Sequence, residues 1–595
     1  MPLHHRRTER RLLRRAGIVL GVLLVLGFVA YRVFLSMVDI EAPDTPDTPD
    51  VATTLDGERV VFGDSWMARR GKIWEVHLKG DPFELGYANG RLAFFFHRRA
   101  DRHMASLAET FVPNRAVRWG LYNFLRWRYR HVADALPPEL QMELAGIARG
   151  YEPDPFAGEM DTYARVIFYH ALHDITQPLV HSPLLGCTSF AAAGKATAGG
   201  HLVIGRNFDF DGGEIFDTDK AVLFFEPKEG IPFASVGWPG LAGVVTGMNA
   251  EGVYLSVNAG RVKEPAAEGF PVILLLRWVL QHAHSMAEAI DLLRAHPIMV
   301  GDIVLVGDGE TGESAVVELG PGKIGVRGPD EHGILVAANH FLTDALKDDP
   351  GNLEAMKTLT TLNRHARMLE ALAPHEGAID PGRALSVLRD RLAVGGKPLG
   401  PGNRNALDAL IATHAVVVDA TAKTLWVTEA PHTLGRAIAF DLRRELAPAA
   451  GPVSAGGPPV DFPEDPYLRG GYDAYVAAKT LYGEAVAFAE AGQTALAEDA
   501  LRRALAVLPT HPASHKLLGD LSLKEGKVEA ARAHYAAFLG ASPDNGEEVE
   551  DAKAKLASLG PPPPAAPAVA PGAPPAPPPP PPGPPAATAA PAAAP

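Results

Sequence analysis

The residues best suited to covalent chemistry in this 595-residue chain surround its only cysteine. Cys187 lies in the segment GCTSF at residues 186–190, and a second polar segment, GRNFD, follows at residues 205–209. A single thiol rules out an internal disulfide. It is therefore either a small buried hydrophobic residue or a nucleophile, and the nearby amide and carboxylate of Asn207 and Asp209 favour the nucleophile.

A β-hairpin would bring the two segments together. Residues 187–193 and 201–210 are short apolar runs typical of strands, and the intervening stretch holds three glycines, which predict a loop. If this loop closes symmetrically, Cys187 lies opposite Asn207, with Asp209 one pleat away on the same face. The sequence therefore predicts that a thiol, an amide and a carboxylate converge.

Arg206 does not fit this face, because neighbouring residues of a regular strand point to opposite sides. Either Gly205 marks a bulge that redirects Arg206, or Arg206 packs elsewhere. A thiol with an ordinary pKa of about 8.5 needs an activating base at neutral pH. No histidine is fixed beside Cys187 by the local sequence.

The pair of segments, Cys-Thr-Ser-Phe followed by Gly-Arg-Asn-x-Asp, resembles the penicillin acyltransferase-like autoproteolytic hydrolases. This family belongs with the choloylglycine hydrolases among the N-terminal-nucleophile enzymes. Further segments resemble the family in order: GDPFELGYANG at 80–90, ELAGIARG at 143–150, GMNAEGV at 247–253, Asn258, and AANH at 337–340. The resemblance implies a cysteine amidohydrolase or acyltransferase that acts on a small acyl-amide substrate and needs no cofactor or metal.

The resemblance also implies how Cys187 is activated. Its thiol attacks the carbonyl of Gly186 and the chain breaks through a thioester. The new α-amino group, with a typical pKa of about 7.7 to 8.0, then serves as the base for the thiol. Gly186 suits this step because it lacks a Cβ. Asp209 would hold the α-ammonium group, and Arg206 would lie beside the sulfur.

Asn258 and Asn339 are the candidates for amide donors to the tetrahedral oxyanion, where one donor contributes about 3 to 4 kcal/mol. Otherwise they are turn or strand-end residues that cap backbone groups. Asn207 is a further candidate. Arg404 is the nearest match to a later arginine that completes the site in relatives.

The order of helical and β-like patterns predicts the fold class. Helical patterns dominate residues 84–175 and β-like runs dominate residues 187–260. Downstream, the patterns predict a helix over 272–294, strands near 302–306, 314–318 and 333–338, helix over 351–395, and strands at 414–418 and 424–428. Runs of strands flanked by runs of helices predict a layered α+β protein. The resemblance implies a four-layer α/β/β/α N-terminal-nucleophile hydrolase sandwich over residues 55–445.

An apolar segment at residues 16–38 precedes this domain and would span about 34 Å as a helix, enough to cross a membrane. Six arginines lie in the basic tail at residues 1–15. By the positive-inside rule, the tail stays cytoplasmic and the catalytic domain is exported. A cleaved signal peptide is the alternative to an anchor. The Pro- and Asp-rich residues 39–54 predict an extended stalk.

Composition changes again after the catalytic domain. Residues 446–470 are rich in Ala, Pro and Gly and predict a linker. Residues 471–545 show the 34-residue period of tetratricopeptide repeats, which either bind a protein partner or only cap the chain. Residues 546–595 are predicted to form a disordered tail rich in Pro and Ala. The formal charge of −14 argues against nucleic acid as a partner.

Together these features predict a membrane-anchored enzyme that cuts itself before Cys187 and then cleaves or transfers the acyl group of a linear amide. The sequence leaves open the acyl group and the choice between hydrolysis and transfer, because both depend on pocket shape and water exclusion. The alternative function is a membrane-tethered repeat scaffold with a vestigial hydrolase domain. The retained Cys187 and Asp209 count against that alternative.

Overall fold

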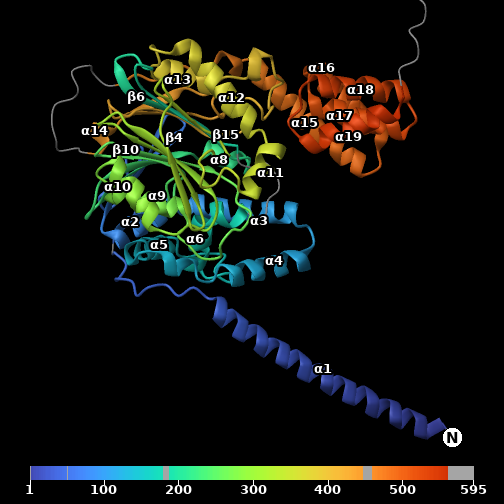
Figure 1. Cartoon of the computed structure of the whole chain (residues 1–595). Coiled ribbons are helices and arrows are strands. Elements are labelled where there is room, and N and C mark those ends of the chain that lie inside the picture. Colours follow the sequence, from blue (N-terminus) through green and yellow to red (C-terminus); the bar gives the residue numbers. More distant parts are fainter. Residues whose placement is uncertain (1, 50, 178–185, 447–458, 561–595) are drawn as a thin grey trace, which may run out of the picture.

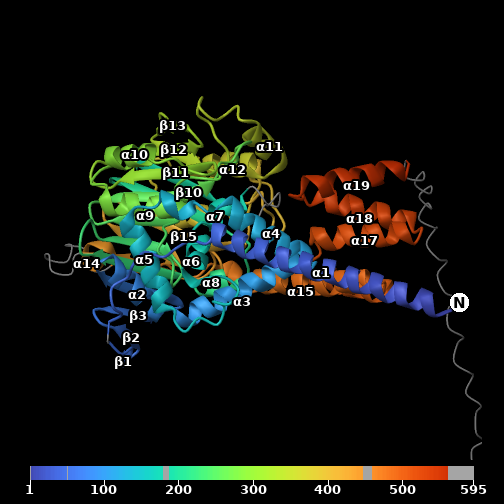
Figure 2. The same cartoon turned by 90° about the horizontal axis from the view of Figure 1, so that it is seen from below.

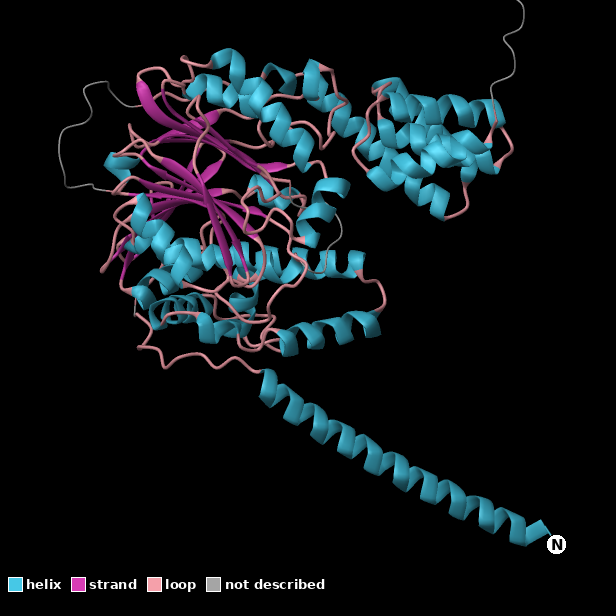
Figure 3. Cartoon of the chain, viewed as in Figure 1, coloured by secondary structure: helices cyan, strands magenta, loops and turns pink. Residues whose placement is uncertain are grey.

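The computed structural model describes residues 2–49, 51–177, 186–446 and 459–560, and its centre is a sandwich of two β-sheets between helical layers (Figures 1 and 3). Within these residues the larger sheet has eleven strands in the order β1-β2-β3-β4-β7-β8-β9-β10-β11-β12-β13. Neighbouring strands are antiparallel except for β4 and β7. The strands are β1 (Thr54–Asp56), β2 (Arg59–Phe62), β3 (Ser65–Arg70), β4 (Ile73–Gly80), β7 (Ala221–Pro227), β8 (Phe233–Gly237), β9 (Thr246–Asn249), β10 (Val253–Ala259), β11 (Asp302–Asp308), β12 (Ser314–Gly320) and β13 (Lys323–Arg327).

The smaller sheet, in the described part of the chain, has six antiparallel strands in the order β14-β5-β6-β15-β16-β17. They are β5 (Thr188–Gly194), β6 (Gly200–Asp209), β14 (Ile334–Ala337), β15 (Ala412–Asp419), β16 (Thr424–Thr428) and β17 (Ala437–Asp441). Alternate residues of this sheet, such as Leu202, Ile204 and Val416, pack against Leu305 and Val236 of the larger sheet. Both faces of each sheet are covered, which explains the nearly continuous apolar runs in the strands.

Helices cover the outer faces of the sandwich and confirm the predicted four-layer α+β arrangement. The larger sheet packs against α2 (Pro82–Leu92), α5 (Pro138–Gly150), α9 (Val272–His282) and α10 (Met286–Ala295). The smaller sheet packs against α12 (Thr361–Leu372) and α13 (Pro381–Leu388). Shorter helices are α6 (Thr162–His170), α7 (Leu172–Thr176), α8 (Glu214–Thr218), α11 (Pro350–Thr358) and α14 (Leu442–Glu445).

Four glycines of the family-like segments at 80–90 and 143–150 serve packing. A Cβ on Gly86 or Gly90 of α2 would overlap backbone atoms of α5, and a Cβ on Gly146 or Gly150 would overlap the backbone of α2. Residues four apart share one helix face, so these glycines let the two helices pack backbone to backbone. They position the helical layer and take no part in the chemistry.

The single helix predicted over residues 272–294 is wrong, because the chain forms two helices there. Helix α9 ends at His282, and Ser285 caps α10 by accepting a hydrogen bond from Glu288 N at 3.3 Å. A serine at this position satisfies a backbone donor at a helix start, so it favours a new helix over continuation of the old one.

Helix α1 (Pro2–Val38) projects from the sandwich (Figures 1 and 2). Its segment Leu13–Val38 has a mean hydropathy of 2.5 and is exposed, so it is long and apolar enough to cross a membrane or to act as a signal sequence. Near its end α1 meets α4 (Arg115–Arg128), where the ring centroids of Tyr31 and Trp119 lie 5.7 Å apart. Helix α4 forms a hairpin with α3 (Phe94–Phe111).

The C-terminal helices lie beside the sandwich (Figure 1) and are α15 (Gly471–Glu490), α16 (Thr494–Val507), α17 (Pro512–Lys524), α18 (Val528–Gly540) and α19 (Gly546–Ser558). The prediction of a disordered tail from residue 546 is wrong for 546–558. Val549, Ala552 and Leu556 recur at helical spacing and pack against Tyr535 of α18. Residues 561–595 of the predicted tail and 447–458 of the predicted linker lie outside the described residues.

The helical repeats contact the sandwich through an apolar cluster, in which Tyr475 of α15 packs with Leu410 and Leu434, and through hydrogen bonds to one short loop. Asn403 Nδ2 donates to the Ser542 carbonyl oxygen at 2.8 Å, and the backbone nitrogen of Arg404 donates to Asp544 Oδ2 at 2.5 Å. Ser542 and Asp544 belong to the connection between α18 and α19. The loop at residues 400–405 is therefore tied to the repeats.

Candidate active site

Strands β5 and β6 form the predicted hairpin, but the pairing differs by one residue from the expected register. Thr188 lies opposite Asn207, because a bulge between Ala192 and Gly194 shifts the pairing near the loop. The expected symmetric closure placed Cys187 there instead. A shift of one residue moves side chains to the other face of a sheet.

The expectation that Asn207 shares a face with Cys187 is consequently wrong. Asn207 Nδ2 donates to the backbone carbonyls of Leu388 and Leu407, both at 2.8 Å, on the side of α13. Arg206 takes the inner face instead and points between the sheets, where the sulfur lies. The strand pairs regularly at Gly205, so no bulge there is needed to place Arg206 on the inner face.

Cys187 is buried in the sandwich with 1% of its surface exposed. Burial raises the pKa of its thiol, and the neighbouring Arg206 guanidinium opposes that effect. Arg206 donates to the Val245 carbonyl oxygen at 2.8 Å, and also to Thr246 Oγ1 and the Val257 carbonyl oxygen. The sulfur therefore faces a cation that both sheets hold in place.

Asp209 lies beside the Gly186–Cys187 bond. The Gly186 nitrogen donates to the Asp209 carbonyl oxygen at 3.2 Å, and Cys187 Sγ lies 4.0 Å from the same oxygen. A Cβ on Gly186 would stand 3.4 Å from Asp209 Oδ2, so the carboxyl group lies against Gly186. Burial raises the pKa of Asp209 to about 7. Among the described residues, Asp209 Oδ1 is buried without a hydrogen-bond partner.

Arg364 on α12 is a residue of this site that the sequence did not reveal. Its Nη1 donates to the Cys187 carbonyl oxygen and to Thr188 Oγ1, both at 2.6 Å, and its Nη2 donates to Asn339 Oδ1 at 2.8 Å. Its charge lowers the pKa of Asp209 against the effect of burial. It lies 177 residues from Cys187 and belongs to no recognisable motif, so no local signal could have found it.

Arg364 donates directly to Cys187, whereas Arg404 borders the site on the side of Asp209. It forms an ion pair with Asp211 at 2.8 Å and lines a small crevice together with Gly186, Asp209 and Arg364. Arg404 also lowers the pKa of Asp209 through its charge. Two arginines thus face the same carboxyl group from the outer side of the smaller sheet.

The two asparagines proposed as oxyanion donors are joined to the site through other side chains, Asn258 through Ser189 and Asn339 through Arg364. Asn258 on β10 reaches across the sandwich to Ser189 Oγ at 3.3 Å, and its Nδ2 also donates to the backbone carbonyls of Ala337, the last residue of β14, and Ala338. Asn339 Nδ2 donates to the Ala259 carbonyl oxygen at 2.8 Å. Both side-chain amides therefore donate to backbone carbonyls in this structure. To donate to an oxyanion, each Nδ2 must share its hydrogen bond or give up a carbonyl partner.

A cavity of about 1030 Å³ borders the site. Its lining includes Phe208, which packs in the same apolar cluster as Cys187, Val245, whose carbonyl binds Arg206, and Asn339. Helices α3 and α4 supply much of the remaining wall. The volume lies just above the usual range for small-molecule sites, about 300 to 1,000 Å³.

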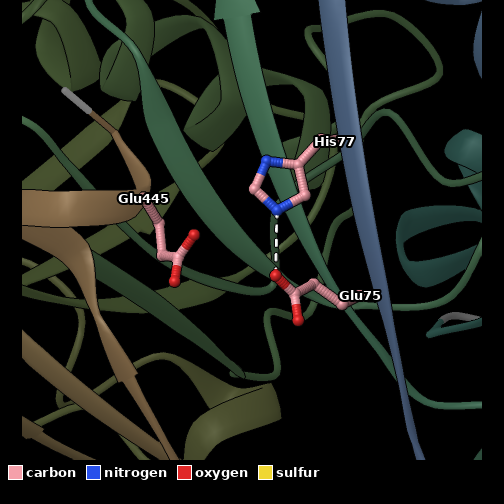
Figure 4. A group of neighbouring side chains, drawn as sticks. All are labelled: Glu75, His77 and Glu445. Carbon is pink, nitrogen blue, oxygen red and sulfur yellow. Dashed lines mark hydrogen bonds and ion pairs between the residues drawn. The ribbon is translucent and has the colours of Figure 1, made fainter. Parts of the chain in front are cut away.

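One cluster in the described part of the chain has the residue types of a metal site: Glu75 and His77 on β4 with Glu445 on α14 (Figure 4). His77 Nε2 and Glu75 Oε1 lie 3.0 Å apart. Arg70 pairs with Glu75 at 3.7 Å and with Glu445 at 3.6 Å. A guanidinium group therefore already balances the two carboxylates, and the cluster gives no reason to assign a metal.

Comparisons with known proteins yield distant relatives and similar structures. An uncharacterized protein of Archaeoglobus fulgidus is 24% identical over 299 residues, and protein dcd1B of Dictyostelium discoideum is 22% identical over 289 residues. Each alignment covers 45% of this chain, which spans only 50% and 54% of the two relatives. Solved structures include an N-acylethanolamine-hydrolyzing acid amidase ortholog of Caenorhabditis elegans (16% identity, TM-score 0.30) and a conjugated bile acid hydrolase of Clostridium perfringens (14% identity, TM-score 0.29). These structures cover 40% and 43% of this chain and 93% of their own.

Two family models match separate parts of the chain. Residues 488–556 match the tetratricopeptide repeat, a module that suggests interaction with a protein. Residues 196–395 match the model described as acyl-coenzyme A:6-aminopenicillanic acid acyl-transferase. This match contains β6, strands β7 to β13 of the larger sheet, and α12 with Arg364. The chain therefore contains a region similar to the penicillin acyltransferase family, followed by tetratricopeptide repeats.

Proposed function

We propose that this protein is a membrane-anchored, self-processing cysteine amidohydrolase or acyltransferase with Cys187 as its nucleophile. The observation that carries the proposal is the set of groups around the Gly186–Cys187 bond. A buried thiol faces Arg206, the carboxyl group of Asp209 with its raised pKa lies against Gly186, and Arg364 holds the Cys187 carbonyl oxygen.

Self-processing starts with attack of Cys187 Sγ on the carbonyl carbon of Gly186. The C–N bond breaks, the thiol proton ends on the Cys187 nitrogen, and a thioester joins Gly186 to the sulfur. Water then hydrolyses the thioester to a Gly186 carboxylate and a free thiol. Asp209, with a pKa of about 7, can accept and return the proton at neutral pH.

The freed α-amino group of Cys187 is formed beside Asp209, whose Oδ1 has no partner among the described residues and can accept a hydrogen bond from it. The neutral amine takes the thiol proton in each later turnover. The thiolate then attacks the carbonyl carbon of a substrate amide. The amine part of the substrate leaves with a proton, and an acyl-thioester remains on Cys187. Water completes hydrolysis, or an acceptor amine completes transfer. Asn258 and Asn339 are the proposed donors to the oxyanion.

We place the enzyme on the exported side of a membrane, with residues 16–38 as the anchor. The arginine-rich residues 1–15 precede the anchor and favour a cytoplasmic N-terminus. The proposed division assigns residues 55–445 to the enzyme and the helices from residue 471 to the repeats. A protein partner would bind through these repeats.

Self-processing is tested with the full chain and its Cys187→Ala variant, expressed in parallel. We expect the wild-type chain to give fragments 1–186 and 187–595, with cysteine at the N-terminus of the second, and Cys187→Ala to stay whole. Only the cut protein should hydrolyse N-acyl amides. An intact wild-type chain that hydrolyses these amides would contradict self-processing, and an active Cys187→Ala chain would contradict the role of the thiol.

A further inference from the structure

The hairpin of α3 and α4 forms one wall of the cavity that borders the Cys187 site at Phe208 and Asn339. Met104, Leu107 and Phe111 of α3 and Leu121 and Leu125 of α4 line the cavity. These positions recur every three or four residues, so one face of each helix forms an apolar wall. A hydrocarbon chain matches this wall, whereas a polar acyl group would lose its hydration there without gaining partners.

The opposite side of α4 is also apolar, although it faces outward. Val117, Trp119, Phe124 and Trp127 expose between 45% and 59% of their surfaces. Large apolar side chains gathered on one exposed helix mark an interaction surface more often than an ordinary solvated one.

The charge of this segment identifies the kind of surface that α4 meets. No acidic residue occurs between Glu109 and Asp134, although the chain as a whole carries a formal charge of −14. The same stretch contains five arginines: Arg115, Arg118, Arg126, Arg128 and Arg130. Arg126 is buried, Arg115 is exposed, and the other three are half-buried. Exposed tryptophans with accessible arginines beside them fit the boundary between lipid acyl chains and anionic headgroups.

The position of α4 relative to α1 agrees with such a boundary. Tyr31 lies near the end of the apolar segment Leu13–Val38 and contacts Trp119 of α4. Figure 2 shows α4 beside this end of α1. If α1 crosses a membrane, this contact lies close to the level at which the apolar segment leaves the membrane on the side of the enzyme.

We infer that the α3–α4 hairpin lies in the membrane interface and that the cavity beneath it takes the acyl chain of a lipid amide from the bilayer. The chain lies against the inner faces of α3 and α4, and the amide reaches Cys187 past Phe208. This inference rests on the proposed function for the fate of the acyl group, while the position of the hairpin is independent of catalysis.

The position of the hairpin is tested without activity. Cys187 is the only cysteine, so the full-length Cys187→Ala chain accepts a spin label at one chosen site. We expect labels at Phe124→Cys and Trp127→Cys in phospholipid nanodiscs to collide more with oxygen than with a water-soluble nickel complex. A label at Leu496→Cys, on exposed α16, should show the reverse. Labels on α4 that behave like the one on α16 would overturn the inference.

The substrate class is tested with N-acyl nitroanilides from acetyl to palmitoyl. In wild-type protein we expect kcat/KM to rise by up to about fourfold for each added methylene until the cavity is filled. Leu107→Trp should remove the advantage of long chains and spare short ones, while Leu496→Trp should change neither. Hydrolysis that favours short chains would overturn the inference and leave the proposed function standing. If no amide reacts, the proposed function fails, and the spin labels still decide the position of the hairpin.

Discussion

Arg364 offers the sharpest test of the site, because it joins the Gly186–Cys187 region to α12. It belongs to no recognisable sequence motif. It is buried and donates two hydrogen bonds of 2.6 Å to residues 187 and 188 and one of 2.8 Å to Asn339. Lysine keeps the positive charge but loses the planar fork that makes these bonds together. Arg364→Lys should therefore displace Cys187 without removing the cation.

The size of the effect follows from these bonds. A hydrogen bond from a charged group contributes about 1.5 to 3 kcal/mol, and loss of one or two at Cys187 removes about 3 kcal/mol of positioning. If that loss falls on the transition state for self-processing, the rate falls by about 100-fold. Arg367→Lys is the matched control. It lies on the same helix, and its partner is Asp390 at 2.6 Å, away from the thiol.

The assay follows conversion of newly made full-length chain into its two fragments, by gel densitometry and intact mass. Thermal unfolding of both variants in a Cys187→Ala background checks that the fold survives. We expect slow processing for Arg364→Lys with a thermal midpoint close to that of the parent, and normal processing for Arg367→Lys. Processing of Arg364→Lys at the wild-type rate would refute the positioning role of Arg364, as would equal slowing of both variants.

Three further outcomes follow from the structure. Because Asp209 has a pKa raised from 3.8 to about 7, its contribution to folding is present below about pH 4 and lost as the pH rises through 7. Relative to Cys187→Ala, the double variant with Asp209→Asn should therefore gain about 4 kcal/mol in unfolding free energy between pH 4 and pH 8, and parallel denaturation curves would contradict the raised pKa. Asp544→Ala removes the acceptor for the Arg404 nitrogen and should speed hydrogen exchange at residues 400–405, whereas unchanged exchange would show that this bond does not hold the loop. Glu318 is fully buried and accepts bonds from the backbone nitrogens of residues 342 and 343, so Glu318→Ala should destabilise the enzyme domain by about 3 to 5 kcal/mol in denaturant titrations, and a loss below 1 kcal/mol would exclude that role.

The features that could be predicted from the sequence are those that depend on a local pattern of residues. The hairpin, the layered α+β fold and the repeats follow from alternation, turn glycines and a fixed period. The faces of the hairpin did not follow, because the glycines at 194, 199 and 200 allow more than one closure and the bulge beside Gly194 adds a residue to one strand. The role of α19 was missed because its apolar residues are few and sit next to the Pro-rich end.

The remaining parts of the site depend on contacts between distant segments. Arg364 reaches Cys187 only through the packing of α12 on the smaller sheet. The cavity wall combines α3 and α4 with strand ends far along the chain, so no window of sequence contains it. Propensity and periodicity describe single elements, whereas such a site is a property of their assembly.

The bond between the Arg404 nitrogen and Asp544 adds a polar link to the apolar packing that joins the repeats to the sandwich. Arg404 also borders the crevice that contains Gly186 and Asp209, so the loop that carries it belongs to both the repeats and the catalytic layer. A peptide that shifts the repeats on binding must also change the free energy of the loop conformation that shapes this crevice. By thermodynamic linkage the effect is reciprocal: whatever fills or reshapes the crevice changes the affinity of the repeats for the peptide by the same factor.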